Sequence, residues 1–182
     1  RQLAEWTVAG YDVSISINIS AVQFKDEDFC RIVADSIEEF GVDPKKLDIE
    51  LTEGMLIDDI EQAVSRLNTI KEMGISISID DFGTGYSSFS YLRQLPIDRL
   101  KIDQAFIRDI PDGDDGQIAA TVIVLAKALG LKVLAEGVES EAHLAFLKQH
   151  DCDEYQGYYR SRPIAAAEVV EHFSRRVSYA DA

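Results

Sequence analysis

The sequence has little cysteine and no excess of positive charge, and each shortage excludes a class of protein. Only Cys30 and Cys152 are cysteines among the 182 residues, and they form no Cys-x-x-Cys pair. This argues against a disulfide scaffold or a zinc ribbon and suits a reducing cytoplasm. The 33 acidic residues outnumber 18 lysines and arginines, which gives a formal net charge of −15. Such a chain repels nucleic-acid backbones, so we expect no DNA binding.

Long hydrophobic runs are also missing. The longest apolar stretch, residues 118–135, is interrupted by Lys127 and Lys132 and contains a Leu-Gly-Leu break. This pattern predicts a helix followed by a strand and no membrane span. With 46% hydrophobic and 28% charged residues, the composition predicts a single globular domain over residues 1–182. A chain of this length can bury a core without disulfide or metal support.

Six apolar runs of strand length alternate with segments of helical pattern. The predicted strands span residues 13–20, 47–52, 75–80, 100–103, 132–136 and 154–158. The predicted helices span residues 26–40, 59–73, 87–95, 115–129, 140–150 and 165–177. Strands that alternate with helices predict an α/β fold in which a parallel sheet carries helices on its outer face.

Polar side chains share one face of each predicted strand and extend to its carboxyl end. Side chains two residues apart point the same way, so Ser16 lies on the face of Asn18, and Ser78 lies on the face of Asp80. The late polar residues of the other strands are Glu50, Lys101, Asp103, Glu136 and Gln156. With helices outside the sheet, these ends converge where α/β barrels and open sheets place their sites. The alternative, separate strand ends that face solvent, stays open at this point.

The predicted cluster offers oxygen ligands almost exclusively. Its members are Asn18, Glu50, Asp80, Asp81, Asp103, Glu136 and Gln156. An oxygen-only set selects Mg²⁺ or Mn²⁺ over Zn²⁺. The adjacent carboxylates of Asp80 and Asp81 favour a pair of divalent ions, which would activate a water and stabilise the leaving oxygen of a phosphodiester. Lys101 suits the developing phosphorane or the water, whereas His143, His150 and His172 fall in helical surface patterns and are interpreted as structural.

Six ordered motifs resemble those of the EAL-domain family. They are Asn18 in Ser-Ile-Asn-Ile-Ser, Glu50-Leu-Thr-Glu, Asp80-Asp-Phe-Gly-Thr-Gly-Tyr-Ser-Ser, Leu-Lys101-Ile-Asp, Ala-Glu136-Gly-Val-Glu, and Gln156-Gly-Tyr followed by Ser-Arg-Pro. Members of this family are bacterial phosphodiesterases that linearise cyclic di-GMP to 5′-pGpG. The resemblance implies a TIM-like (β/α)₈ barrel of EAL type, here truncated at its N-terminus to about six βα units.

The resemblance also implies roles for individual residues. The implied metal ligands are Asn18, Glu50, Asp80, Asp81 and Glu136. Lys101 resembles the lysine that orients the hydrolytic water, and Glu136 resembles the glutamate proposed as general base or second-metal ligand. Asp103 and Gln156 would support the second metal and its waters, and Glu139 would support the site from farther out. Glu53 resembles the glutamate that anchors the Asp-Phe-Gly-Thr-Gly loop.

Cofactors and partners follow from the same resemblance. It implies two Mg²⁺ or Mn²⁺ ions in the active form, inhibition by Ca²⁺, and cyclic di-GMP as the substrate. It further implies a homodimer formed through the loop from Asp81 to Ser88. The resemblance also implies sensory or GGDEF-type domains in the parent protein and a location in the bacterial cytoplasm.

One departure from the family pattern is the missing Glu-Ala-Leu motif. The chain begins with Arg1-Gln-Leu-Ala-Glu-Trp, which resembles the helix after the strand that carries this motif. We therefore expect a truncated chain, whose 182 residues alone have weak or no catalytic activity. Two alternatives remain: an inactive EAL domain that serves as a cyclic di-GMP receptor or protein-interaction module, and an unrelated metal phosphodiesterase on a similar barrel.

Overall fold

Six parallel strands form one sheet in which every strand lies beside its neighbours in the sequence. The computed structural model describes residues 1–57, 59–83, 92–108, 110 and 115–177. The strands are β1 (Ile15–Asn18), β2 (Leu47–Thr52), β3 (Ser76–Phe82), β4 (Arg99–Ile102), β5 (Lys132–Ala135) and β6 (Glu154–Tyr155). The sheet order is β1-β2-β3-β4-β5-β6, and all five pairings are parallel.

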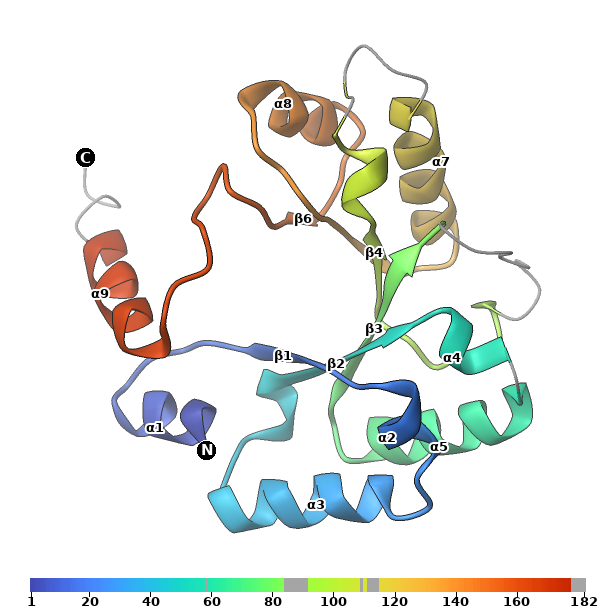
Figure 1. The fold of residues 1–182 in the computed structure, drawn as a ribbon, viewed down its shortest axis with the longest axis vertical. Coiled ribbons are helices and arrows are strands. Elements are labelled where there is room, and N and C mark those ends of the chain that lie inside the picture. Colours follow the sequence, from blue (N-terminus) through green and yellow to red (C-terminus); the bar gives the residue numbers. More distant parts are fainter. Residues whose placement is uncertain (58, 84–91, 109, 111–114, 178–182) are drawn as a thin grey trace.

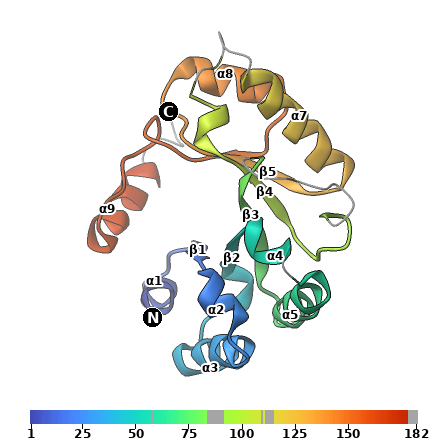
Figure 2. The ribbon, with the colours of Figure 1, turned by 45° about the vertical axis from the view of Figure 1, so that its right-hand side comes forward.

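Helices cover the outside of this sheet. They are α1 (Gln2–Val8), α2 (Ala21–Lys25), α3 (Phe29–Phe40), α4 (Gly54–Ile57), α5 (Ile60–Glu72), α7 (Asp115–Ala128), α8 (Glu141–Gln149) and α9 (Ala166–Val177), with short 3₁₀ turns η1 (Pro44–Lys46) and η2 (Gln104–Phe106). Figures 1 and 2 show the strands as an arc that is open between β1 and β6, with α3, α5, α7 and α8 around its convex side. The arrangement is an arc of an α/β barrel, which confirms the predicted fold class.

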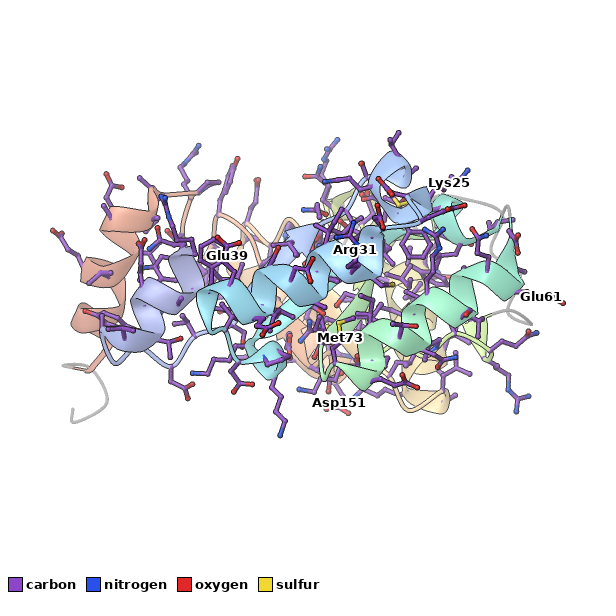
Figure 3. All side chains as sticks on the ribbon, turned by 90° about the horizontal axis from the view of Figure 1, so that it is seen from below. Lys25, Arg31, Glu39, Glu61, Met73 and Asp151 are labelled. Carbon is purple, nitrogen blue, oxygen red and sulfur yellow. The ribbon has the colours of Figure 1, made fainter. Side chains whose placement is uncertain are left out.

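The hydrophobic core lies between the sheet and the outer helices. The outward side chains of the strands are almost fully buried: Ile49, Leu51, Ile77, Ile79, Leu100, Ile102, Val133 and Ala135. They pack with buried side chains of the helices such as Leu67 and Ile70 of α5 and Ile123 of α7. The charged side chains of the helices face away from the sheet, as Figure 3 shows for Arg31 and Glu39 on α3. The concave face of the sheet is therefore left to polar side chains.

Several predicted boundaries shift by a few residues for local reasons. The helix expected from residue 26 begins at Phe29, and the separate helix α2 precedes it because Ser20 and Gln23 form a reciprocal capping box. Strand β3 continues to Phe82 through a register shift against β4 between Ile79 and Phe82. Most of the helix expected over residues 87–95 lies outside the described residues. Among the described helices, none has the length and apolarity needed to cross a membrane.

Candidate functional site

Lys101 stands in the middle of a ring of carboxylates on the concave face of the sheet. Its Nζ lies 2.6 Å from Glu50 Oε2, 3.0 Å from Asp80 Oδ1 and 2.6 Å from Glu136 Oε1. These side chains come from β4, β2, β3 and the end of β5, and Lys101 is buried. Converging strands thus bring together four residues that lie far apart in the sequence, as the alternation of polar side chains predicts.

Asp80, Asp81 and Glu136 form a second grouping within this ring. One carboxylate oxygen of each lies within 4.8 Å of the others, a spacing at which all three could hold the same ion. Lys101 contacts two of these three carboxylates, those of Asp80 and Glu136, so one positive charge faces three partly buried negative charges. The chemistry of the set, oxygen donors only, fits a hard divalent cation such as Mg²⁺.

The backbone at Asp81 is strained in a way that directs its side chain. Its φ of 54° lies in the left-handed region that non-glycine residues seldom adopt. The Asp81 N–H donates to Asp80 Oδ1 at 3.0 Å, at the point where β3 shifts its register against β4. Burial raises the pKa of Asp81, and a hydrogen bond with Asp103 and the charge of Asp80 raise it further. The charge of Lys101 opposes this rise.

Lys101 and Glu136 both have a raised pKa, but the rise has opposite consequences for their charges. Burial lowers the pKa of Lys101, but the hydrogen bonds and charges of Glu136 and Glu50 outweigh burial and hold it above its ordinary value. Lys101 therefore stays protonated at neutral pH. Burial raises the pKa of Glu136, the charges of Asp80 and Glu50 add to the rise, and Lys101 opposes it. One lysine does not compensate the carboxylates that surround it.

The remaining candidate residues lie around this centre at different depths. Gln156 Nε2 donates to Glu136 Oε1 at 2.7 Å, which connects the end of β6 to the ring. Asp103 follows β4 and caps η2, where its Oδ1 accepts from the Ala105 N–H at 2.7 Å. Asn18 is exposed at the end of β1, in register with Glu50. Residues 84–88 of the predicted interface loop lie outside the described part of the chain.

Two glutamates beyond the ring occupy contrasting positions. Glu53 is buried just after β2. Glu139 is exposed, and its N–H donates to His143 Nδ1 at 3.3 Å. The structural interpretation of His143 therefore stands, but its predicted surface position is wrong, because α8 carries this side chain inward to cap the loop after β5.

A cleft adjoins the ring at the carboxyl end of β5 and β6. It encloses about 610 Å³ and is lined by Glu136, Gln156, Tyr158 and Arg162, among other residues. Gly137 turns the chain into this cleft with a φ of 67°, and a Cβ there would lie 2.5 Å from Gln104 Cβ. The Arg162 guanidinium carbon lies 4.6 Å from the Tyr158 ring centroid. The cleft is large enough for a small-molecule ligand.

The candidate list drawn from the sequence omits a second polar layer below the ring. Arg99, one of its members, lies two residues before Lys101 on the same face of β4 and contacts Asp48 of β2. The spacing of two residues was the available signal, and it places Arg99 on the concave face. The partners of Arg99 depend on how the neighbouring strands are staggered. The sequence of a single strand does not reveal this stagger.

The EAL domain family model matches residues 1–163 of the chain. Signaling protein YkoW of Bacillus subtilis is 44% identical over 165 residues, which make up 90% of this chain and 21% of that protein. Cyclic di-GMP phosphodiesterase NbdA of Pseudomonas aeruginosa is 42% identical over 177 residues, 96% of this chain and 22% of that protein. The chain thus spans about a fifth of the length of these relatives.

A solved structure with the same architecture is that of the PaMucR phosphodiesterase in complex with c-di-GMP. It aligns with a TM-score of 0.89 and 38% sequence identity, covering 92% of this chain and 69% of that one. The arc of six strands described above is therefore shared with a structure that contains this dinucleotide.

Proposed function

The chain belongs to the EAL domain family, and from this premise we propose that its site hydrolyses cyclic di-GMP to linear 5′-pGpG. The observation that carries the proposal is the ring itself: Lys101 contacts three carboxylates, and Asp80, Asp81 and Glu136 lie within reach of one ion. The neighbouring cleft supplies room for a nucleotide beside these groups. The names of the relatives NbdA and PaMucR point to the same chemistry.

The proposed cofactor is a pair of Mg²⁺ or Mn²⁺ ions held by the oxygen donors of the site. The proposed ligands are Asn18, Glu50, Asp80, Asp81 and Glu136. When bound, such ions polarise phosphate oxygens, lower the pKa of water and stabilise the leaving oxygen. Ca²⁺ is larger and accepts less regular coordination, which supports its proposed role as an inhibitor.

The residues of the chain divide the remaining work according to their protonation. Lys101 stays protonated, so its Nζ orients the attacking water and offsets charge on the phosphate but accepts no proton. Glu136, whose pKa is raised, is the better acceptor for the proton of that water. The water oxygen forms a bond to phosphorus as the bond between phosphorus and the 3′ oxygen breaks. The leaving 3′ oxygen takes up a proton from solvent, and Glu136 returns its proton to solvent, so the products are a 5′-phosphate and a 3′-hydroxyl in one linear dinucleotide.

The other candidate residues receive supporting roles in this proposal. Gln156 fixes Glu136 through the hydrogen bond between them, and Asp103 lies at hydrogen-bond distance from Asp81. These contacts suit residues that hold the second ion and its waters. Glu53 is proposed to anchor the Asp-Phe-Gly-Thr-Gly loop that begins at Asp81, and Glu139 is proposed to support the site from farther out.

The proposal extends to assembly and context. We place residues 1–182 in one domain of a cytoplasmic protein that contains further sensory or GGDEF-type domains. The small share of the relatives' length that the chain covers supports such additional domains. A homodimer formed through the loop from Asp81 to Ser88 would put the partner next to the carboxylates at the site.

The test is an assay of the natural protein that carries this chain. Purified protein is incubated with cyclic di-GMP and Mg²⁺, Mn²⁺ or Ca²⁺, and the nucleotides are separated by chromatography. We expect 5′-pGpG with Mg²⁺ or Mn²⁺ but not with Ca²⁺, and no product from the Asp80→Asn variant. Calorimetric binding of cyclic di-GMP without any linear product would instead identify a receptor.

A matched control separates the loss of a ligand from the loss of a carboxylate in general. Asp59 caps α5, where its Oδ1 accepts from the Gln62 N–H. Asparagine caps helices as well as aspartate does, so Asp59→Asn should retain the activity of the wild type. Equal losses in the Asp59 and Asp80 variants would count against a specific role for Asp80.

A further inference from the structure

A second ring of polar side chains lies below the site, one step toward the amino ends of the strands. This floor layer consists of Ser16, Asp48, Ser78, Arg99 and Glu154. Each member precedes a residue of the site by two positions on the same strand or its direct extension, and these residues are Asn18, Glu50, Asp80, Lys101 and Gln156. Side chains two positions apart share a face, so the floor layer lies directly under the site.

The guanidinium of Arg99 joins three other strands within this layer. Its Nη1 donates to Asp48 Oδ2 of β2 at 2.9 Å and to Ser78 Oγ of β3 at 3.2 Å. Its Nη2 lies 3.0 Å from Glu154 Oε2 of β6. Its Nε is buried and has no hydrogen-bond partner among the described residues. The two terminal nitrogens therefore hold the layer from β4, with β2 and β3 on one nitrogen and β6 on the other.

Asp48 completes the layer by collecting donors from its neighbours. This buried carboxylate accepts from Ser16 Oγ of β1 at 3.0 Å and from Ser78 Oγ at 2.8 Å, in addition to Arg99. The floor layer thus connects five of the six strands with hydrogen bonds that do not belong to the sheet ladder. Its charges balance, because Arg99 and Lys132, whose Nζ lies 3.5 Å from Glu154 Oε1, face the carboxylates of Asp48 and Glu154.

Strand β6 connects the floor layer to the site through two residues, Glu154 and Gln156. This strand pairs with β5 at Glu154 and Tyr155, and the backbone hydrogen bonds continue from the Gln156 N–H to Ala135 O at 2.8 Å and from the Val138 N–H to Gln156 O at 3.0 Å. Arg99 supplies an additional anchor at Glu154. Two residues later Gln156 donates to Glu136, which in turn lies 2.6 Å from Lys101. A shift of β6 would therefore move Gln156 and disturb the carboxylate that it orients.

We propose that Arg99 is a positioning residue for the site layer. It fixes β2 and β6 relative to β4, so that Glu50 and the Gln156–Glu136 pair meet around Lys101. Both layers place a cation on β4, and in the floor layer the two terminal nitrogens of the Arg99 fork divide the contacts, one on Asp48 and the other on Glu154. The inference rests on the proposed function where kcat is measured. Where Mn²⁺ affinity is measured, it rests on metal binding alone.

The decisive variant is Arg99→Lys in the natural protein. Lysine keeps the charge but replaces the two terminal nitrogens, one on Asp48 and one on Glu154, with a single Nζ that lacks the fork geometry. We expect the variant to melt close to the wild type, to bind Mn²⁺ about 10- to 100-fold more weakly in calorimetry, and to lower kcat with little change in KM. A purely structural role would change the melting temperature and leave Mn²⁺ affinity and kcat as they are.

A second variant guards against failure to fold. The triple change Arg99→Met, Asp48→Asn and Glu154→Gln removes the buried charges together, so no carboxylate is left unpaired. We expect it to fold and to show the same weakened Mn²⁺ binding as Arg99→Lys. The control is Lys71→Met, which removes the ion pair between Lys71 of α5 and Asp98 outside both layers and should leave Mn²⁺ binding and kcat unchanged.

The outcomes separate the two proposals. Weaker Mn²⁺ binding in the Arg99→Lys variant would support the positioning role even if the wild type released no 5′-pGpG, which would refute the proposed hydrolysis alone. Wild-type Mn²⁺ affinity and kcat in both Arg99 variants would refute the positioning role and leave the hydrolysis intact.

Discussion

The concave face of the sheet carries two layers of polar side chains. They come from the same strands but have different roles. In the site layer, Lys101 contacts Glu50, Asp80 and Glu136, with Asp81 close by. In the floor layer, Arg99 contacts two carboxylates, and serine hydroxyls fill much of the remaining hydrogen-bonding capacity. The two cations lie two residues apart on β4. The layers differ in their ratio of carboxylates to cations.

This difference is what we expect if the site layer binds cations and the floor layer supports it. The floor is nearly balanced in charge, so its geometry is stable without any additional group. The site layer has an excess of carboxylates, and the pKa values of Glu136 and Asp81 are raised because burial and neighbouring charges disfavour their ionised forms. A site with an excess of partly buried carboxylates lowers its free energy by binding a cation, whereas a balanced layer has no such need.

The largest expected effect comes from neutralising a carboxylate of the site. Glu136→Gln should lower phosphodiesterase activity by about 10²–10⁴-fold, because it removes the proposed proton acceptor. The metal-free variant should be at least as stable as the wild type, since the pKa of Glu136 is raised and its ionised form is disfavoured in the folded protein. Product chromatography and thermal melting measure the two effects, and a clear loss of stability would contradict the charge excess.

Removing the cation of the floor should have the opposite signature. Arg99→Met leaves the buried carboxylate of Asp48 without its charge partner, while Glu154 keeps Lys132, and unpairing a buried ion pair costs about 3–5 kcal/mol. Denaturant unfolding of the metal-free protein measures this cost. If the variant were as stable as the wild type, the floor could not be the balanced support described above.

A smaller effect should follow from adding the metal. At about a hundred times its Kd, Mn²⁺ should raise the free energy of unfolding of the wild type by about 2.7 kcal/mol. The Asp80→Asn variant should lose most of this gain, while Asp59→Asn should keep it. Thermal melting at increasing Mn²⁺ concentration gives the comparison, and identical gains in all three proteins would place the ion elsewhere.

The smallest expected effect concerns a thiol that belongs to neither layer. Cys152 packs before β6, where its Sγ lies 3.3 Å from the Glu154 carbonyl oxygen, and burial raises its pKa to about 11. Because only the thiolate reacts, iodoacetamide should modify Cys152 about a hundredfold more slowly than free cysteine at pH 8. The rate should increase as the pH approaches 11. Mass spectrometry measures it, and rapid modification at pH 8 would show that the start of β6 opens readily.

Much of the fold and of the site follows from alternation within single strands. Strand β2 has the predicted boundaries Leu47–Thr52, because its polar and apolar residues alternate along its whole length. The same alternation predicts that Glu50, Asp80, Lys101 and Glu136 meet at one end of the sheet, as they do. Alternation with a period of two residues predicts which side chains of a strand are buried against the helices and which face the site. The sequence of one strand is therefore sufficient for this prediction.

Contacts that depend on several elements could not be predicted in the same way. Strand β6 is shorter than predicted, since the chain turns at Gly157, where a Cβ would lie 2.3 Å from the backbone of Val138. The strained backbone at Asp81 lies where β3 shifts its register against β4. The partners of Arg99 depend on how the strands are staggered around the arc. Each of these features is decided by neighbours distant in sequence.

The central claim is that the carboxylate excess around Lys101 is a site for two divalent cations, and counting bound ions tests it most directly. Mn²⁺ bound to the natural protein is measured by electron paramagnetic resonance in the presence of cyclic di-GMP, for the wild type and for Asp80→Asn. The account predicts two ions per chain in the wild type and a loss of both strong sites in the variant. Equal Mn²⁺ binding by the two proteins would contradict it.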